Sequence, residues 1–148
     1  MKTNKRCIVT LSVVYVIALI VNIIPSATFP DATIRPLHAA ASVALLFCLL
    51  GTCLLRNQVA KLYITALLFA SVTVFTLNSF ETYMRDILLL DALFSIQYPL
   101  YILFVSPLFG LNFFLNVGAE YVALITFFIA ILLLIIHEVA ITASRERL

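Results

Sequence analysis

The chain has 148 residues, of which 64% are hydrophobic and 11% are charged, and its formal net charge is +2. Soluble domains have ~45–50% apolar and ~25% charged residues, so this composition excludes a water-soluble globular protein. The nine basic residues form no run interleaved with aromatics, which argues against binding to nucleic acid. An odd count of three cysteines argues against a disulfide framework. We therefore expect one integral-membrane domain over residues 1–148, with an all-α fold: a polytopic bundle of transmembrane helices.

The first two predicted spans cover residues 7–24 and 37–55. Lys2, Lys5 and Arg6 precede the first apolar run, which is longer than the ~7–15 apolar residues of a secretory signal. We expect a retained span and not a cleaved signal peptide. The positive charge before it predicts that the N-terminus of a multi-pass plasma-membrane protein lies in the cytoplasm.

Small residues recur every four positions in the second span and in the third, which is predicted over residues 62–80. In lipid this spacing lets another helix approach closely. The expected helix-packing residues are Ala40, Ala44 and Cys48 in the second span and Ala66 and Ala70 in the third. We expect them to close spans two and three into a hairpin, with a dimer face as the alternative.

The stretch 87–116 decides how many times the chain crosses the membrane. A fourth span at 87–109 and a last span at 119–140 make five, whereas a stretch that dips and returns leaves four spans plus a re-entrant or interfacial segment. Length favours five spans, since ~20 apolar residues cross ~30 Å of hydrocarbon. Charge bias favours four spans, because the arginines of the tail then join the cytoplasmic side. We expect five, with Pro99 and Pro107 kinking the fourth helix, because a small bundle has little protein to shield non-helical backbone.

Asp91 and Gln97 are the candidate polar residues at membrane depth. Polar and ionisable side chains are costly in hydrocarbon and often mark a pathway for a solute or ion. Gln97 also precedes Pro99, and a broken helix beside polar side chains is a pattern that transporters use. The structural alternative is that Asp91 reaches the membrane interface and that Gln97 satisfies backbone groups freed by the proline.

A metal site is conceivable only in the five-span arrangement, where His38, Asp91, His137 and Glu138 would all lie near the outer leaflet. The sequence has no H-E-x-x-H or comparable ligand spacing. We therefore expect no metal, no cofactor and no catalytic residue.

The function that the sequence favours is a small multi-pass membrane protein without catalytic activity. It would be an accessory, assembly or immunity-type subunit that acts through helix–helix contacts, with the lipid bilayer and another membrane protein or a second copy as partners. The alternative is an oligomeric small-solute or ion transporter or channel centred on Asp91 and Gln97. A third possibility is an intramembrane metal-dependent enzyme.

Overall fold

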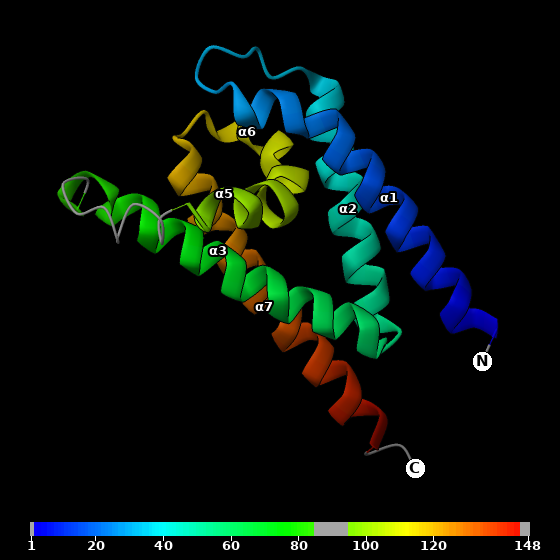
Figure 1. Ribbon diagram of the computed structural model, residues 1–148. Coiled ribbons are helices and arrows are strands. Elements are labelled where there is room, and N and C mark those ends of the chain that lie inside the picture. The colour runs from blue at the N-terminus through cyan, green and yellow to red at the C-terminus, as the bar shows by residue number, and fades with distance from the viewer. Residues whose placement is uncertain (1, 85–94, 146–148) are drawn as a thin grey trace.

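The computed structural model describes residues 2–84 and 95–145, with side chains for 5–80 and 95–144, and every regular element within this part is a helix. Four helices are long: α1 (Lys2–Ala27), α2 (Pro36–Leu54), α3 (Gln58–Met84) and α7 (Ala119–Arg145). Between α3 and α7 lie α5 (Gln97–Leu100), the π-helical η1 (Tyr101–Val105), the 3₁₀-helical η2 (Ser106–Leu111) and α6 (Asn112–Leu115) (Figure 1). Five stretches of the described chain are long and apolar enough to cross a membrane, so the predicted all-α bundle is confirmed.

Side-chain hydrogen bonds begin α2 and α3, and a left-handed residue follows the end of α2. The backbone N–H of Arg35 donates to Nδ1 of His38 at 2.8 Å, which satisfies a group that the first turn of α2 leaves unpaired. Arg56 adopts a left-handed conformation (φ 55°) just after α2 and turns the chain back. Oδ1 of Asn57 then accepts the N–H of Val59 at 2.9 Å and caps the start of α3.

The long helices form two antiparallel pairs, α1 with α2 and α3 with α7 (Figure 1). At one end of the second pair, Nζ of Lys61 lies 2.5 Å from Oε1 of Glu138. At its other end, Val74 of α3 and Val122 of α7 belong to the same buried cluster. The expected hairpin of spans two and three is therefore wrong: α3 packs along α7 and touches α2 only slightly.

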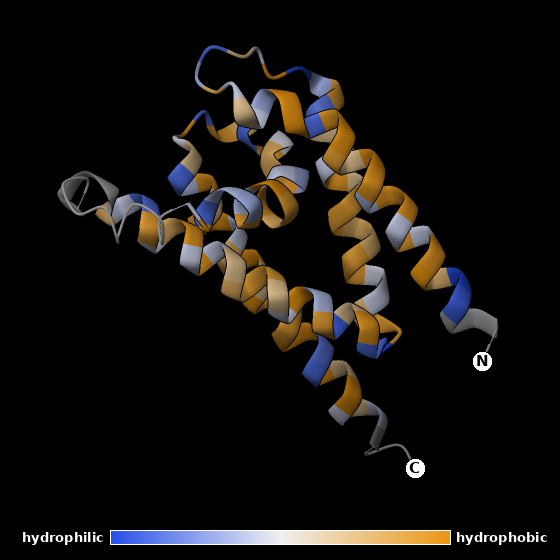
Figure 2. Cartoon of the chain, viewed as in Figure 1, coloured by the Kyte–Doolittle hydropathy of each residue, from blue (hydrophilic) through white to orange (hydrophobic). Residues whose placement is uncertain are grey.

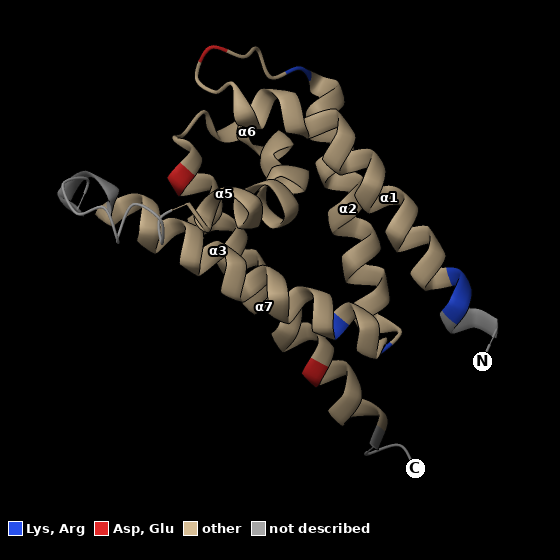
Figure 3. Ribbon diagram, in the orientation of Figure 1, with Lys and Arg blue, Asp and Glu red and all other residues tan. Residues whose placement is uncertain are grey.

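The charged residues mark two ends of the bundle (Figure 3). The basic end contains the beginning of α1, the α2–α3 turn and the last turns of α7, and its described cationic residues are Lys5, Arg6, Arg56 and Lys61. The loop end contains the connection between α1 and α2 and the start of α7, with Asp31, Arg35 and Glu120. Between these ends the long helices are mostly hydrophobic (Figure 2).

Residues 97–115 leave the loop end and descend toward the middle of the bundle. Gln97 lines a cavity together with Asn78 of α3 and so lies near the loop end. Further on, the carbonyl of Leu103 accepts a hydrogen bond of 2.7 Å from the hydroxyl of Tyr15. Tyr15 stands twelve residues before the last residue of α1, roughly 18 Å along the helix, which is about half of the ~30 Å hydrocarbon thickness.

The same segment then returns to the loop end. Oγ of Ser106 lies 2.7 Å from Oγ of Ser26, near the last turn of α1. Gly110 lies against the first turn of α2, where a Cβ added to it would be 1.9 Å from the carbonyl oxygen of His38. Because the segment begins and ends at the loop end, we call residues 97–115 the re-entrant segment; Figure 1 shows it as a compact coil among the long helices.

An open cavity lies between the re-entrant segment and the basic end. Below Leu103 and Phe104, a cavity of about 340 Å³ lies between α1 and α3, with Leu11, Val59 and Tyr63 among its lining residues. The fourth stretch meets the length and apolarity of a span, as the sequence predicted, and its described path begins and ends at the loop end. Residues 87–94, the first part of the predicted span, lie outside the described residues.

Candidate functional site

Of the two polar residues singled out in the sequence, the structure describes one. Asp91 lies outside the described residues. Gln97 is 3% exposed and lines a cavity of about 250 Å³ at the loop end, between α1, α3 and the re-entrant segment. The other polar residues that line this cavity are Ser26, Asn78, Tyr98 and Tyr101.

A second group of polar side chains surrounds the carbonyl of Pro107, at the point where the re-entrant segment returns. Oγ of Ser42 donates to this carbonyl at 2.9 Å, and Nδ2 of Asn22 approaches it at 3.3 Å. Asn22 also donates to Oγ of Ser42 at 3.2 Å and to the carbonyl of Ala18 at 2.9 Å. Asn22 and Ser42 are fully buried, so these bonds join α1, α2 and the re-entrant segment away from water.

Pro107 lies where the helix changes from the π-helical η1 to the 3₁₀-helical η2, and Pro99 lies in the first turn of α5. Because proline has no N–H, the carbonyl of Leu103, four residues before Pro107, lacks its usual helical donor. The hydroxyl of Tyr15 supplies that donor from α1. Before Pro99, the carbonyl of Ser95 instead accepts the N–H of Tyr98 at 3.3 Å. The two prolines thus help to fold a returning segment, where the sequence predicted a kinked crossing helix.

The polar residues of α1 that hold the re-entrant segment were missed in the sequence, although their spacing is a detectable signal. Tyr15, Asn22 and Ser26 are seven and four residues apart, which places them on one face of a helix. A polar stripe inside an apolar transmembrane helix indicates that the stripe faces protein. In the structure all three bond to the re-entrant segment.

The small-residue stripe of α2 points out of the bundle. Ala40 and Ala44 are exposed and Cys48 is half-buried, whereas the buried face of α2 holds Ala39, Ser42, Leu45 and Leu49. The prediction that the stripe packs within the chain is therefore wrong for Ala40 and Ala44. In α3, Ala70 is buried and Ala66 is half-buried, as expected of packing residues.

The stripe of α2 continues into a groove toward the basic end. Cys48 and Gly51 line a hollow of about 240 Å³ between α2 and α1. A Cβ added to Gly51 would meet nothing within 4 Å. These four small residues extend over roughly 16 Å of α2 at 1.5 Å per residue. Phe47, which is 69% exposed, lies beside them on the same face.

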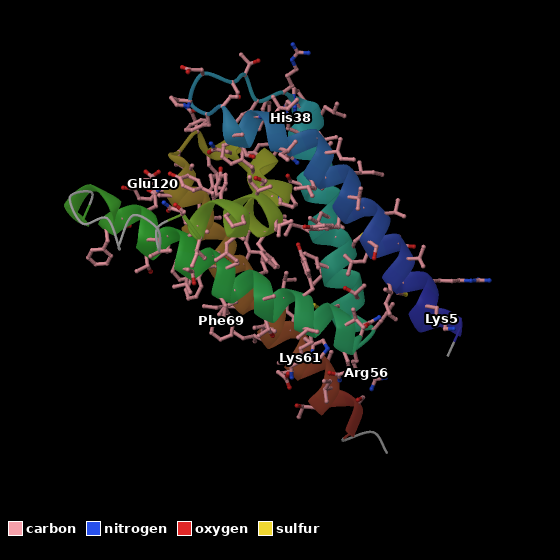
Figure 4. The ribbon with its side chains drawn as sticks, viewed as in Figure 1. Lys5, His38, Arg56, Lys61, Phe69 and Glu120 are labelled. Atoms are coloured by element: carbon pink, nitrogen blue, oxygen red, sulfur yellow. The ribbon has the colours of Figure 1, made fainter. Side chains whose placement is uncertain are left out.

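The residues considered for a metal site are separated. His38 lies at the loop end, whereas Lys61, the partner of Glu138, lies at the basic end (Figure 4). Within the described part of the chain, no group of three or more His, Cys, Asp or Glu side chains could hold a metal ion. His137 is fully buried beside Glu138, with Nδ1 at 3.7 Å from Oε1, and neither ring nitrogen has a hydrogen-bond partner.

The described residues leave two places for an interaction. A helix could pack along α2 at its small residues, and a solute could form hydrogen bonds in the cavity at Gln97. Comparisons with protein-family models, with curated proteins and with solved structures found no match to this chain.

Proposed function

We propose that the chain is a plasma-membrane protein with four crossings, a re-entrant segment that dips in from the outer side, and both termini in the cytoplasm. The support is the charge distribution: the basic end combines the four cationic side chains described there with the start of α1 and the end of α7. Cytoplasmic loops and tails are enriched in lysine and arginine. In this arrangement the tail arginines also join the cytoplasmic side.

The orientation is tested with reporter fusions. A reporter fused after Leu148 is expected to be active only in its cytoplasmic form, and a fusion at Ala32 in the α1–α2 connection only in its external form. An external C-terminus would overturn the four-crossing arrangement.

We further propose that the protein is a non-catalytic accessory or assembly subunit that binds another membrane helix along α2. The observation that carries this proposal is the outward direction of Ala40 and Ala44. Apolar side chains gain little from association in lipid, so helices associate where small residues allow their backbones to come close. The hollow at Cys48 and Gly51 extends the same face.

Photo-crosslinking within the membrane tests the contact. A photoreactive residue at position Ala40 is expected to form a defined protein adduct, whereas the same residue at Val13, a position of α1 that is 53% exposed, forms none. Adding Ala44→Leu is expected to reduce the adduct at least tenfold, because the larger side chain separates the two backbones. Since Ala44 is exposed, the free energy of unfolding should not change. Equal adducts at both positions, or an adduct that survives Ala44→Leu, would refute the proposal.

A second candidate function is the passage or sensing of a small solute. The cavity that contains Gln97 favours it, because a buried amide and several hydroxyl groups meet there beside a segment that does not cross the bundle.

A further inference from the structure

The cavity at the loop end is built from four separate parts of the chain. α1 contributes Ser26 and Ala27, α3 contributes Val74 and Asn78, and Ala119 begins α7. The re-entrant segment contributes Gln97, Tyr98, Tyr101 and Ile102. The re-entrant segment therefore lines the cavity with the residues by which it leaves the loop end, before it turns back.

The lining has hydrogen-bonding groups but no formal charge. The amides of Asn78 and Gln97 and the hydroxyl of Tyr98 are groups that can donate and accept hydrogen bonds, and the hydroxyl of Tyr101, which donates to Ser26, can still accept one. Val74 and Ile102 add an apolar surface. The lining residues themselves offer an ion no countercharge in exchange for its hydration, so they favour an uncharged partner. The carboxylate of Glu120, whose charge acts on Tyr101, is not among the lining residues.

Two of the polar side chains are held in place by the fold. Ser26 is 6% exposed, and its Oγ lies 3.0 Å from the carbonyl of Ile23 and 2.7 Å from Oγ of Ser106. The hydroxyl of Tyr101 donates to the carbonyl of Ser26 at 3.4 Å. Such fixed side chains lose little conformational entropy when a ligand binds.

The size of the cavity sets the scale of the ligand. Its volume is about 250 Å³, larger than the ~150 Å³ of an engineered protein cavity that accepts benzene. We propose that this cavity is a binding site for a small uncharged solute with hydroxyl or amide groups, reached from the outer side of the membrane. This inference rests on the second candidate function and on the proposed orientation, whose solute class and side of entry it names, and it does not depend on the helix contact proposed for α2.

Cysteine accessibility tests whether the cavity is filled with water. Val74 lines the cavity and is 3% exposed, whereas Val105 is fully buried in the same cluster and does not line it. In a chain whose three native cysteines are replaced by alanine, Val74→Cys and Val105→Cys are single, conservative and matched probes. Iodoacetamide reacts with the thiolate, which needs a hydrated site. We expect Val74→Cys to react at least tenfold faster than Val105→Cys in folded protein in lipid nanodiscs.

Protection by solutes tests binding itself. The probes are glycerol, urea and glucose, each at saturating concentration, with choline and glutamate as charged controls. At least one uncharged probe is expected to slow the labelling of Val74→Cys threefold or more. Adding Gln97→Leu should abolish this protection, while labelling of the double variant without any probe stays fast. The proposal is overturned if the two cysteines are labelled equally fast or if no uncharged probe protects Val74→Cys. It is also overturned if the charged probes protect equally well, or if protection persists in Gln97→Leu.

Discussion

Gly110 is the position where one added methyl group should do most damage. In Gly110→Ala, the new Cβ would lie 1.9 Å from the carbonyl oxygen and 2.3 Å from the carbonyl carbon of His38, and 2.7 Å from Oγ of Ser42. The first two atoms belong to the backbone of α2, which cannot rotate away as a side chain can. Overpacking of this kind costs about 1–3 kcal/mol. We expect a loss near the upper limit, about 3 kcal/mol, because the displaced Ser42 also bonds to Pro107.

Gly51→Ala is the matched control, because it adds the same methyl group where nothing lies within 4 Å. Gly51 is inside α2, so alanine there should stabilise the helix by about 0.5–1 kcal/mol. Unfolding in mixed micelles with rising SDS content can be followed by labelling of Cys53, which is fully buried in the folded chain. If the free energies of unfolding of Gly110→Ala and Gly51→Ala agree within about 0.5 kcal/mol, the close packing of the re-entrant segment on α2 is refuted.

Three further substitutions probe other contacts of the fold by the same unfolding assay. Tyr15→Phe removes the hydroxyl that donates to the carbonyl of Leu103 and should cost about 1 kcal/mol; an unchanged stability would show that this bond does not stabilise the fold. Asn112→Ala removes two hydrogen bonds to Val117, of 2.8 and 2.9 Å, and should cost about 1–3 kcal/mol, whereas a loss below about 0.5 kcal/mol would mean that the turn closes without them. His137→Leu replaces a buried ring whose nitrogens have no hydrogen-bond partner, so stability should stay constant or rise; a clear loss would reveal a partner for the ring.

The long helices could be predicted because hydropathy and length suffice for them. The predicted spans 7–24, 37–55, 62–80 and 119–140 each fall almost wholly within one of α1, α2, α3 and α7. Their true ends lie up to several residues further out, because turns with polar side chains continue a helix beyond the apolar run. The helix directions bring the start of α1 and the last turns of α7 to the same end of the bundle.

The re-entrant segment could not be predicted from hydropathy, because a stretch buried among helices and a stretch facing lipid are equally apolar. The decisive information is in pair contacts such as those of Leu103 with Tyr15 and Ser106 with Ser26, and composition does not report which residues pair. The same limit applies to the stripe at Ala40 and Ala44. Small residues indicate a possible close approach, but they do not tell whether the approaching helix belongs to the same chain.

The expectation of five spans assumed that a bundle this small cannot shield broken backbone, and the contacts explain how this bundle does so. Backbone groups in hydrocarbon need partners from within the protein. The carbonyl of Leu103 is bonded by Tyr15 of α1, and the carbonyl of Pro107 is bonded by Ser42 of α2 with Asn22 of α1 beside it.

Shielding therefore depends on where polar side chains stand and not on how much protein surrounds the segment. The polar face of α1 and one serine of α2 supply donors at the two carbonyls beside the turn, and Gly110 lets the returning chain lie directly against α2. A bundle of four long helices can thus hold a re-entrant segment when a few positions on two of its helices are polar or unusually small. Replacing the donors Tyr15 and Ser42 together should then release the segment, measured as faster labelling of a cysteine at Val105, while the pairing of α3 with α7 persists.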